Sequence, residues 1–323
     1  MKKILLFVGL FSLPFFASAH TKWFASEKLE SYHSAEPTSL YLLGALGIIL
    51  FITTVTVILH NKNICRFAWL RPKGKHAYER AASTFAMVTG AFLLIAGTHE
   101  YLFSPNQTLE TGIPYYLIVI QILIGLAFLL GIATRTFSLL LIGIWLLTFH
   151  YLGAISALEN IWVLSTSAFI AIMGNDYFSI ISFSFFRKIF KPFQSYALSL
   201  LRLGTGTTLM ILGFSEKILA PEYGINFLNL YHWNFMHDFG FTNYLFVIAA
   251  GVVEFTLGLL LVLGIATRPV AIVTAIIFTI PLFILGPIEI AGHLPHFAAI
   301  VLLILFDNGG HFTFFKKYKD ARV

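Results

Sequence analysis

Charged residues inside long apolar runs are the strongest candidates for chemistry in this sequence. Glu254 lies within the apolar stretch GVVEFTLGLLLVLG, where a carboxyl group needs a hydrogen-bonded partner or its own proton. Such a group can relay protons or contact a quinone, or it can hold two helices together. Glu216 and Arg202 share the preceding apolar run and are the two other catalytic candidates. Glu216 precedes Lys217, which favours an interfacial ion pair, and Arg202 could pair with an acidic residue or simply mark a helix end.

Histidines form the second pattern. His293 and His296 have the i,i+3 spacing that places two rings on one helix face, where they could ligate one metal ion. Neutral imidazole suits copper, zinc or haem iron, whereas a single histidine can also serve as a helix cap or an interfacial hydrogen-bonding group. The candidates for cofactor binding are His99, Glu100, His150, His293 and His296.

The N-terminus, MKKILLFVGLFSLPFFASAHT, has the pattern of a secretory signal over residues 1–19. Cleavage after Ala19 would leave His20 as the first residue, whose amine and imidazole could begin a copper-binding histidine brace. An accidental histidine at this position is the alternative. The speculative metal ligands are His20, His33, His232 and His237.

Composition indicates the environment in which these residues act. Hydrophobic residues make up 58% of the 323 residues and charged residues only 11%, which is typical of a polytopic membrane protein. The formal charge of +6 comes mostly from basic residues in short loops, so it favours an orientation signal in the lipid bilayer and not binding to nucleic acid. A single cysteine, Cys65, excludes a disulfide within the chain.

Apolar runs predict about nine transmembrane helices in the mature chain, an all-α helical bundle. The positive-inside rule places the mature N-terminus in the periplasm and the C-terminus in the cytoplasm of a bacterial-type inner membrane. The predicted spans cover residues 39–60, 81–103, 114–133, 136–157, 160–179, 196–217, 243–264, 269–288 and 292–307. The predicted segments are a signal at 1–19, a periplasmic segment at 20–38, an anchor at 39–60, a basic loop at 61–80, a four-helix unit at 81–182, a basic linker at 183–195, a second four-helix unit at 196–308 and a basic tail at 309–323.

An internal repeat relates the two four-helix units. GTHEYLFSP at 97–105 corresponds to GFSEKILAP at 213–221, and GIATR occurs at both 131–135 and 264–268. The second copy has 17 more residues in the intervening loop, because the offset grows from 116 to 133. Each copy holds an even number of spans, so the two units should run parallel, with a pseudo-two-fold axis along the membrane normal. Residues 222–241 of the longer loop, rich in aromatic side chains, should form an interfacial helix or a lid.

The second copy resembles the DoxX family of four-helix membrane proteins over about residues 198–306. The resemblance rests on Arg202, Gly206, the stretch 213–217, Glu254 followed by Gly258, and GIATR at 264–268. The first copy departs from it with Ala86, Tyr101 and Gln121 at the places of Arg202, Lys217 and Glu254, which favours one active and one structural unit. The family is named for a membrane subunit of sulfur- or quinol-linked respiratory oxidoreductases, so the resemblance implies redox chemistry linked to a quinone or to a periplasmic partner protein.

The sequence leaves three functions open. The first is a membrane subunit that supports quinone-linked or partner-linked redox chemistry, with Glu254, Glu216, Arg202 and the outer histidines as its site. The outer histidines are those that the predicted topology places toward the external side: His20, His33, His99, His150, His232, His237, His293 and His296. The second is binding or transport of copper or a similar metal through His20 and the outer histidines. The third is a scaffold without a cofactor.

Overall fold

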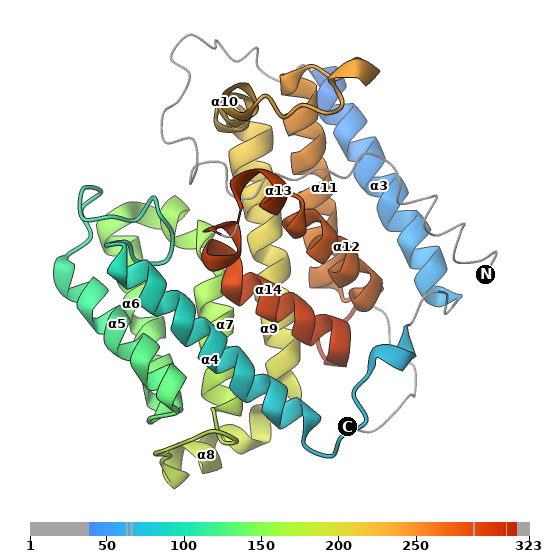
Figure 1. Ribbon diagram of the computed structural model, residues 1–323. Helices are drawn as coiled ribbons and strands as arrows, with labels where there is room; N and C mark the ends of the chain where they lie inside the picture. Colours follow the sequence, from blue (N-terminus) through green and yellow to red (C-terminus); the bar gives the residue numbers. More distant parts are fainter. Residues whose placement is uncertain (1–38, 63, 65–66, 287, 308, 315–323) are drawn as a thin grey trace.

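A computed structural model describes residues 39–62, 64, 67–286, 288–307 and 309–314 of the chain (Figure 1). Over these residues the protein is helical, and no β-strand is assigned among them. The predicted signal, the periplasmic segment and most of the basic tail lie outside the described residues. The prediction of an all-α membrane bundle is confirmed, because the described chain forms long apolar helices packed side by side.

Five helical segments in the described chain are long and apolar enough to cross a membrane, and four further apolar helices are shorter. The five are Leu43–Asn61, Ala77–Thr98, Thr134–Glu159, Ser184–Leu219 and Asn243–Leu263; the four are Tyr115–Leu130, Trp162–Met173, Thr267–Thr279 and Gly292–Phe306. All nine fall where an apolar run predicts a span. A helix rises about 1.5 Å per residue, so the longer segments cover the roughly 30 Å hydrocarbon core.

The first unit contains α4 (Ala77–Thr98), α5 (Tyr115–Leu130), α6 (Thr134–Glu159) and α7 (Trp162–Met173). The second contains α9 (Gln194–Leu212) continued by the π-helix η3 (Gly213–Leu219), then α11 (Asn243–Leu263), α12 (Thr267–Thr279), α13 (Leu282–Leu285) and α14 (Ile288–Phe306). Helix α3 (Ser39–Asn61) stands outside both units and packs against α11. The shorter elements are η1 (Ala68–Leu70), α8 (Ser184–Phe190), η2 (Lys191–Phe193), α10 (Glu222–Tyr231) and η4 (His237–Phe239).

Two predicted spans end earlier than the apolar runs suggest. Helix α7 ends at Met173 because Gly174 adopts a left-handed φ of 70°, which stops the helix well before residue 179. The span predicted at 269–288 is divided into α12 and α13, and Pro281 lies at the break. Proline lacks the N–H group that would continue the helical hydrogen bonds, so hydropathy alone overestimated the length of this helix.

The two units share backbone features at the positions that the repeat makes equivalent. Gly131 and Gly264 both end a helix in the left-handed region, with φ of 64° and 69°. Ala133 and Ala266, each two residues further on, also have positive φ, at 44° and 47°. These pairs are 133 residues apart, as the second half of the repeat predicts. The correspondence fits a duplication, which remains a prediction about the origin of the chain.

Glycines let the first two helices of each unit approach closely. A Cβ atom on Gly90 would lie 2.7 Å from the carbonyl oxygen of Gly125, and one on Gly206 would lie 2.7 Å from the carbonyl oxygen of Gly258. The α4–α5 and α9–α11 contacts are therefore built in the same way. The two units meet through α4 packed on α14 and α9 packed on α7, so the first helix of each contacts the last helix of the other. This exchange is the arrangement expected of two parallel units.

The described loops lie at opposite ends of the bundle. The start of α4 and the short helix α8 are at the lower end in Figure 1, whereas α10 is at the upper end. The lower end therefore carries Arg187, Lys188 and Lys191, which are basic and exposed. Which end faces the cytoplasm stays a prediction from the positive-inside rule.

A buried ion pair in the second unit

The π-helix η3 positions two neighbouring charged residues inside the bundle. Glu216 and Lys217 lie in Gly213–Leu219, and both are almost completely buried. A π-helix closes its hydrogen bonds over one more residue than an α-helix, and such segments occur frequently at functional sites. The first unit has no such segment at the equivalent place, because α4 ends at Thr98 and Glu100 is exposed. Glu216 is thus enclosed by protein, whereas the equivalent Glu100 is exposed; an interfacial position for Glu216 stays a prediction.

The ion pair joins η3 to α11. The ammonium nitrogen of Lys217 lies 2.5 Å from the Oε2 atom of Glu254, and the two side chains are 2% and 4% exposed. Lys217 thus pairs with Glu254 on the neighbouring helix, whereas the sequence favoured a pair between Lys217 and the adjacent Glu216. A charged residue placed in apolar surroundings requires such a partner, because water is not there to solvate it.

Two glycines explain why these side chains meet. A Cβ atom on Gly213 would lie 2.8 Å from the Gly251 carbonyl oxygen and 3.0 Å from the Cβ atom of Glu254. A Cβ atom on Gly251 would lie 2.8 Å from the Cβ atom of Lys217. The backbones of η3 and α11 therefore approach closely only because both positions lack side chains. Lys217 follows Gly213 by four residues and Glu254 follows Gly251 by three, so each charged residue lies on the same helix face as the glycine at the contact.

The first unit has an uncharged counterpart of this pair. Gln121 occupies the position of Glu254, and its Nε2 atom donates to the carbonyl oxygens of Leu93 and Tyr101, at 3.3 and 3.1 Å. Tyr101 is the residue equivalent to Lys217. The same two helix segments are thus linked in both units, by an ion pair in the second and by uncharged hydrogen bonds in the first.

Arg202 belongs to a different part of the bundle. It is fully buried in α9, and its guanidinium donates to the carbonyl oxygens of Leu261, Val262, His311 and Phe312. Fifteen residues of helix separate it from Lys217, which corresponds to roughly 20 Å. Arg202 therefore ties the end of α11 to the segment after α14. The three residues predicted to form one catalytic group do not come together, since Arg202 lies far from Glu216 and Glu254.

Two of the predicted histidines are inside the bundle. His293 and His296 are buried in α14, with ring centroids 5.8 Å apart. The ring of His296 packs against that of Trp162 in α7, with the ring centroids 5.1 Å apart, so His296 lies where the two units meet. Their closeness agrees with the i,i+3 spacing seen in the sequence, and the side of the membrane on which they lie stays a prediction.

The remaining histidine candidates are dispersed. His99, His150, His232 and His237 are all exposed, and His20 and His33 lie outside the described residues. Among the residues that the structure describes, no three His, Cys, Asp or Glu side chains are grouped so that they could hold a metal ion. Metal binding that involves His20 or His33 stays a prediction.

Helix α10 caps the end of the bundle that carries the ion pair. It begins at Glu222, just after η3, and lies at the upper end of α11 (Figure 1). Its apolar residues Ile225, Phe227 and Leu228 form a small core with Phe246 and Val247 of α11. Part of residues 222–241 is therefore helical and packs against the end of the segment that contains Lys217; its position at a membrane interface stays a prediction.

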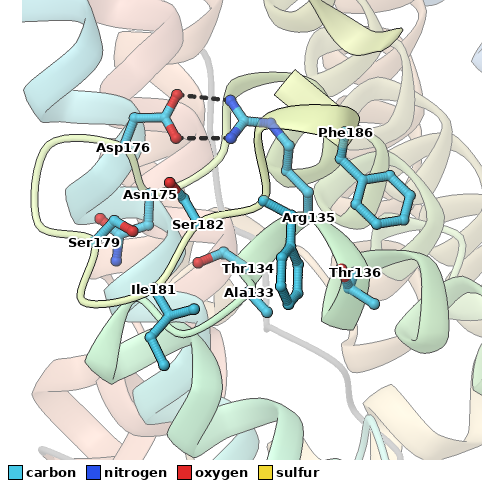
Figure 2. Close-up of a pocket in the computed structure, with 11 residues that line it drawn as sticks. Ala133, Thr134, Arg135, Thr136, Asn175, Asp176, Ser179, Ile181, Ser182 and Phe186 are labelled. Atoms are coloured by element: carbon cyan, nitrogen blue, oxygen red, sulfur yellow. Dashed lines mark hydrogen bonds and ion pairs between the residues drawn. The ribbon is translucent and has the colours of Figure 1, made fainter. Parts of the chain in front are cut away.

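A second polar site lies in the first unit, at the end of the bundle opposite to the Lys217–Glu254 pair (Figure 2). Arg135, at the start of α6, donates to both carboxylate oxygens of Asp176, at 2.7 and 2.8 Å, and to the carbonyl oxygen of Met173. Arg187 adds a second ion pair to Asp176 at 3.0 Å. Burial would raise the pKa of Asp176, but hydrogen bonds and charges from Arg135 and Arg187 outweigh it and hold this pKa below its usual value.

The two inner arginines of the GIATR repeat therefore cap helix ends and do not snorkel to lipid phosphate. Arg268 is buried like Arg135, and it donates to the carbonyl oxygens of Ile304 and Leu305 near the end of α14. Each arginine binds the last turn of the fourth helix of its own unit, where carbonyl groups lack helical partners. Sequence reasoning missed Asp176, although its place just after an apolar run opposite a repeated arginine was a usable signal.

The fold and the buried ion pair define a polytopic helical membrane protein with ionisable groups inside its bundle. Residues 197–287 match the sequence model of the DoxX family, a range that runs from α9 to the end of α13. The resemblance read from the sequence is thereby confirmed over residues 197–287, and this part of the chain is DoxX-like. Neither the curated proteins nor the solved structures include a significant match to the chain.

Proposed function

We propose that this protein is a membrane subunit that supports redox chemistry by moving protons between the bundle and a quinone or a periplasmic redox partner. The Lys217–Glu254 pair is the proton-carrying group of this proposal. Its support is a single observation: the two atoms lie 2.5 Å apart, and both side chains are buried in apolar surroundings. Ionisable groups at such depth are costly, and they mark proton relays in many membrane proteins.

The chemistry follows from the two states of the pair. Lys217 and Glu254 share one proton, which either completes an ammonium beside a carboxylate or leaves an amine beside a carboxylic acid. When quinone reduction requires a proton, the pair can release it and later recover one, while the protein excludes bulk water from the path. Glu216 lies beside Lys217 in η3 and is the candidate for the next group along that path. The first unit, with Gln121, then has a structural role.

Infrared difference spectroscopy on the reconstituted protein, with a reduced and an oxidised quinone, tests this proposal. We expect a carboxylic C=O band that changes with the redox state and disappears in Glu254→Gln, because an amide cannot gain or lose this proton. Glu110→Gln is the matched control, since it makes the same chemical change at an exposed position. Folded Glu254→Gln protein with an unchanged spectrum and unchanged quinone-dependent activity would remove Glu254 from the mechanism.

A further inference from the structure

A short aromatic and basic pattern occurs twice in the chain, outside the helices that form the bundle. Residues 183–188 read FSFFRK and residues 312–317 read FTFFKK, so the same types of residue occur in the same order. Each stretch follows the last helix of a unit, α7 in the first unit and α14 in the second. A pattern that recurs after the same helix of both units indicates a shared role at these two places.

The matching aromatic side chains are exposed in both stretches. Phe183 and Phe185 are 52% and 65% exposed, and their counterparts Phe312 and Phe314 are 56% and 72% exposed. Exposed apolar side chains that gather in this way mark a surface that contacts something else. The basic residues of the second stretch lie outside the described residues, so the first stretch carries the structural argument.

Helix α8 presents part of the first stretch on an apolar face. It lies at the lower end of the bundle, and Pro192 is located where the chain turns from α8 into α9 (Figure 1). Phe186 and Phe190 are half-buried, and Phe190 packs against the main core. Phe185 and Ile189 precede these two residues and are exposed. The apolar surface of α8 therefore continues from the contact with the bundle to an exposed side.

Basic residues occupy the other side of α8. Arg187 and Lys191 are four residues apart, which places them on one face, and Lys188 lies next to Arg187. Arg187 pairs with Asp176 at 3.0 Å, which holds α8 against the end of the first unit. Lys188 and Lys191 are exposed, and neither forms an ion pair with any described residue. Because no acidic residue occurs between Asp176 and Glu216, both lysines keep a positive charge available for a partner.

The surface of an anionic bilayer fits this combination of faces. Helices with basic residues on one side and aromatic or aliphatic residues on the other lie in the layer between headgroups and acyl chains. The neighbouring helices α6 and α7 are apolar, so lipid already surrounds the bundle to which α8 is attached. An acidic protein surface would satisfy the lysines but would leave the exposed apolar side chains without a suitable environment.

We propose that α8 lies in the headgroup layer of the membrane and binds anionic phospholipids. Phe185 and Ile189 would enter the acyl-chain region, while Lys188 and Lys191 would contact lipid phosphates from the aqueous side. The interaction requires no cavity, because all four side chains are exposed. It is independent of the proposed proton transfer, whose residues lie near the other end of the bundle.

Spin-label accessibility in the full-length protein tests the orientation of α8. A nitroxide would be attached at Ile189→Cys or, as the matched control, at Ser184→Cys on the basic side, in a Cys65→Ser background that removes the single native cysteine. In vesicles that contain phosphatidylglycerol, we expect the label at position 189 to collide with oxygen, which concentrates among acyl chains. The label at position 184 should collide with a water-soluble nickel complex. Equal accessibility at the two positions would overturn the orientation.

The same label at position 189 tests the recognition of lipid charge. In phosphatidylcholine vesicles with increasing phosphatidylglycerol, the ratio of lipid-inserted to water-exposed label should rise with the anionic fraction. Lys188→Gln/Lys191→Gln should lower this ratio at least about tenfold, because each basic residue near an anionic surface contributes about a fivefold change. Lys73→Gln/Lys75→Gln is the matched control, since it removes the same charge from an exposed loop outside α8.

Three results would overturn the proposal. Complete insertion of the label in pure phosphatidylcholine would show that the apolar face alone holds α8 and that lipid charge is not recognised. A loss in the Lys73→Gln/Lys75→Gln control as large as in the α8 variant would assign the effect to diffuse surface charge. A label at position 189 that stays exposed to water in all vesicles would show that α8 faces away from the membrane. The α8 substitutions change exposed residues, so the unfolding temperatures in detergent should match that of the wild type.

Discussion

Removing one member of the buried ion pair should destabilise the protein far more than removing both. In Lys217→Met, the carboxyl group of Glu254 keeps its buried position between η3 and α11 but loses the ammonium 2.5 Å away. At an effective dielectric constant of about 20, two unit charges at this distance attract by roughly 7 kcal/mol. Desolvation of the two groups offsets much of that attraction, so the pair itself contributes little net stability.

The expected magnitudes follow from this balance. Lys217→Met or Glu254→Leu alone should lower the free energy of unfolding by about 3–5 kcal/mol, because each leaves a buried group without its partner. The double variant Lys217→Met/Glu254→Leu should recover most of that loss, since apolar side chains then fill the same space. Lys188→Met, at an exposed lysine, should change stability by less than about 0.5 kcal/mol and serves as the control.

A double-mutant cycle measures this coupling. Reversible unfolding in mixed micelles would give the free energy of each variant, with helix content followed by circular dichroism. Strong coupling requires that the cost of the double variant be several kcal/mol smaller than the sum of the single costs. Additive costs, or a Lys217→Met variant as stable as the wild type, would refute the view that a buried pair links η3 to α11.

Three further changes test other parts of the structure. Gly258→Ala should cost about 1–3 kcal/mol, because its Cβ would lie 2.5 Å from the Gly206 carbonyl oxygen, whereas Gly143→Ala, with open space around it, should be tolerated in the same thermal unfolding assay. Arg202→Met should lose at least about 3 kcal/mol and expose residues 307–314 to proteolysis, since several carbonyl oxygens lose a charged donor; unchanged protection would contradict this role. Asp176→Asn should lower the unfolding temperature by about 2–4 °C at pH 7. The pKa of Asp176 is depressed in the folded protein, so the stabilisation by its ion pairs is present above about pH 4 and is lost as the pH falls further. The unfolding temperatures of the wild type and of Asp176→Asn should therefore become equal in acid. A difference in unfolding temperature that stays constant with pH would contradict the ion pairs.

Much of the architecture was predictable because it depends on local properties of the chain. Apolar runs locate all nine apolar helices of the described residues, since burial in a bilayer requires length and hydrophobicity. The repeated GIATR segment predicts equal turns, and both copies do contain a left-handed glycine followed by a left-handed alanine. The helix ends were less predictable, because Gly174 and Pro281 interrupt helices within runs that hydropathy reads as single spans.

The candidate site was predictable only in its parts. A carboxylate inside an apolar helix marks Glu254 as unusual from its sequence alone, and the same rule applies to Arg202. The sequence does not reveal that Lys217 is the partner of Glu254, because this pairing depends on which helices are in contact and on where each residue lies along its helix. Gly213 and Gly251 are the positions at which the two helices approach closely, but this is known only once the structure shows their contact. The π-helix, which turns both Glu216 and Lys217 inward, has no comparable signature.

The sequence by itself therefore determined the class of protein: a helical membrane bundle that is DoxX-like over residues 197–287 and has a few ionisable groups in apolar surroundings. The internal repeat is visible in the sequence as well, and the duplication that it suggests stays a prediction. Hydropathy and the internal repeat are properties of the order of residues along the chain, so both can be found without a structure. The tertiary structure alone decided which charges meet, joining Lys217 to Glu254 and Arg135 to Asp176 while placing Arg202 away from the Lys217–Glu254 pair. An ion pair forms only where two side chains fall within a few ångströms, and that distance is set by the packing of entire helices.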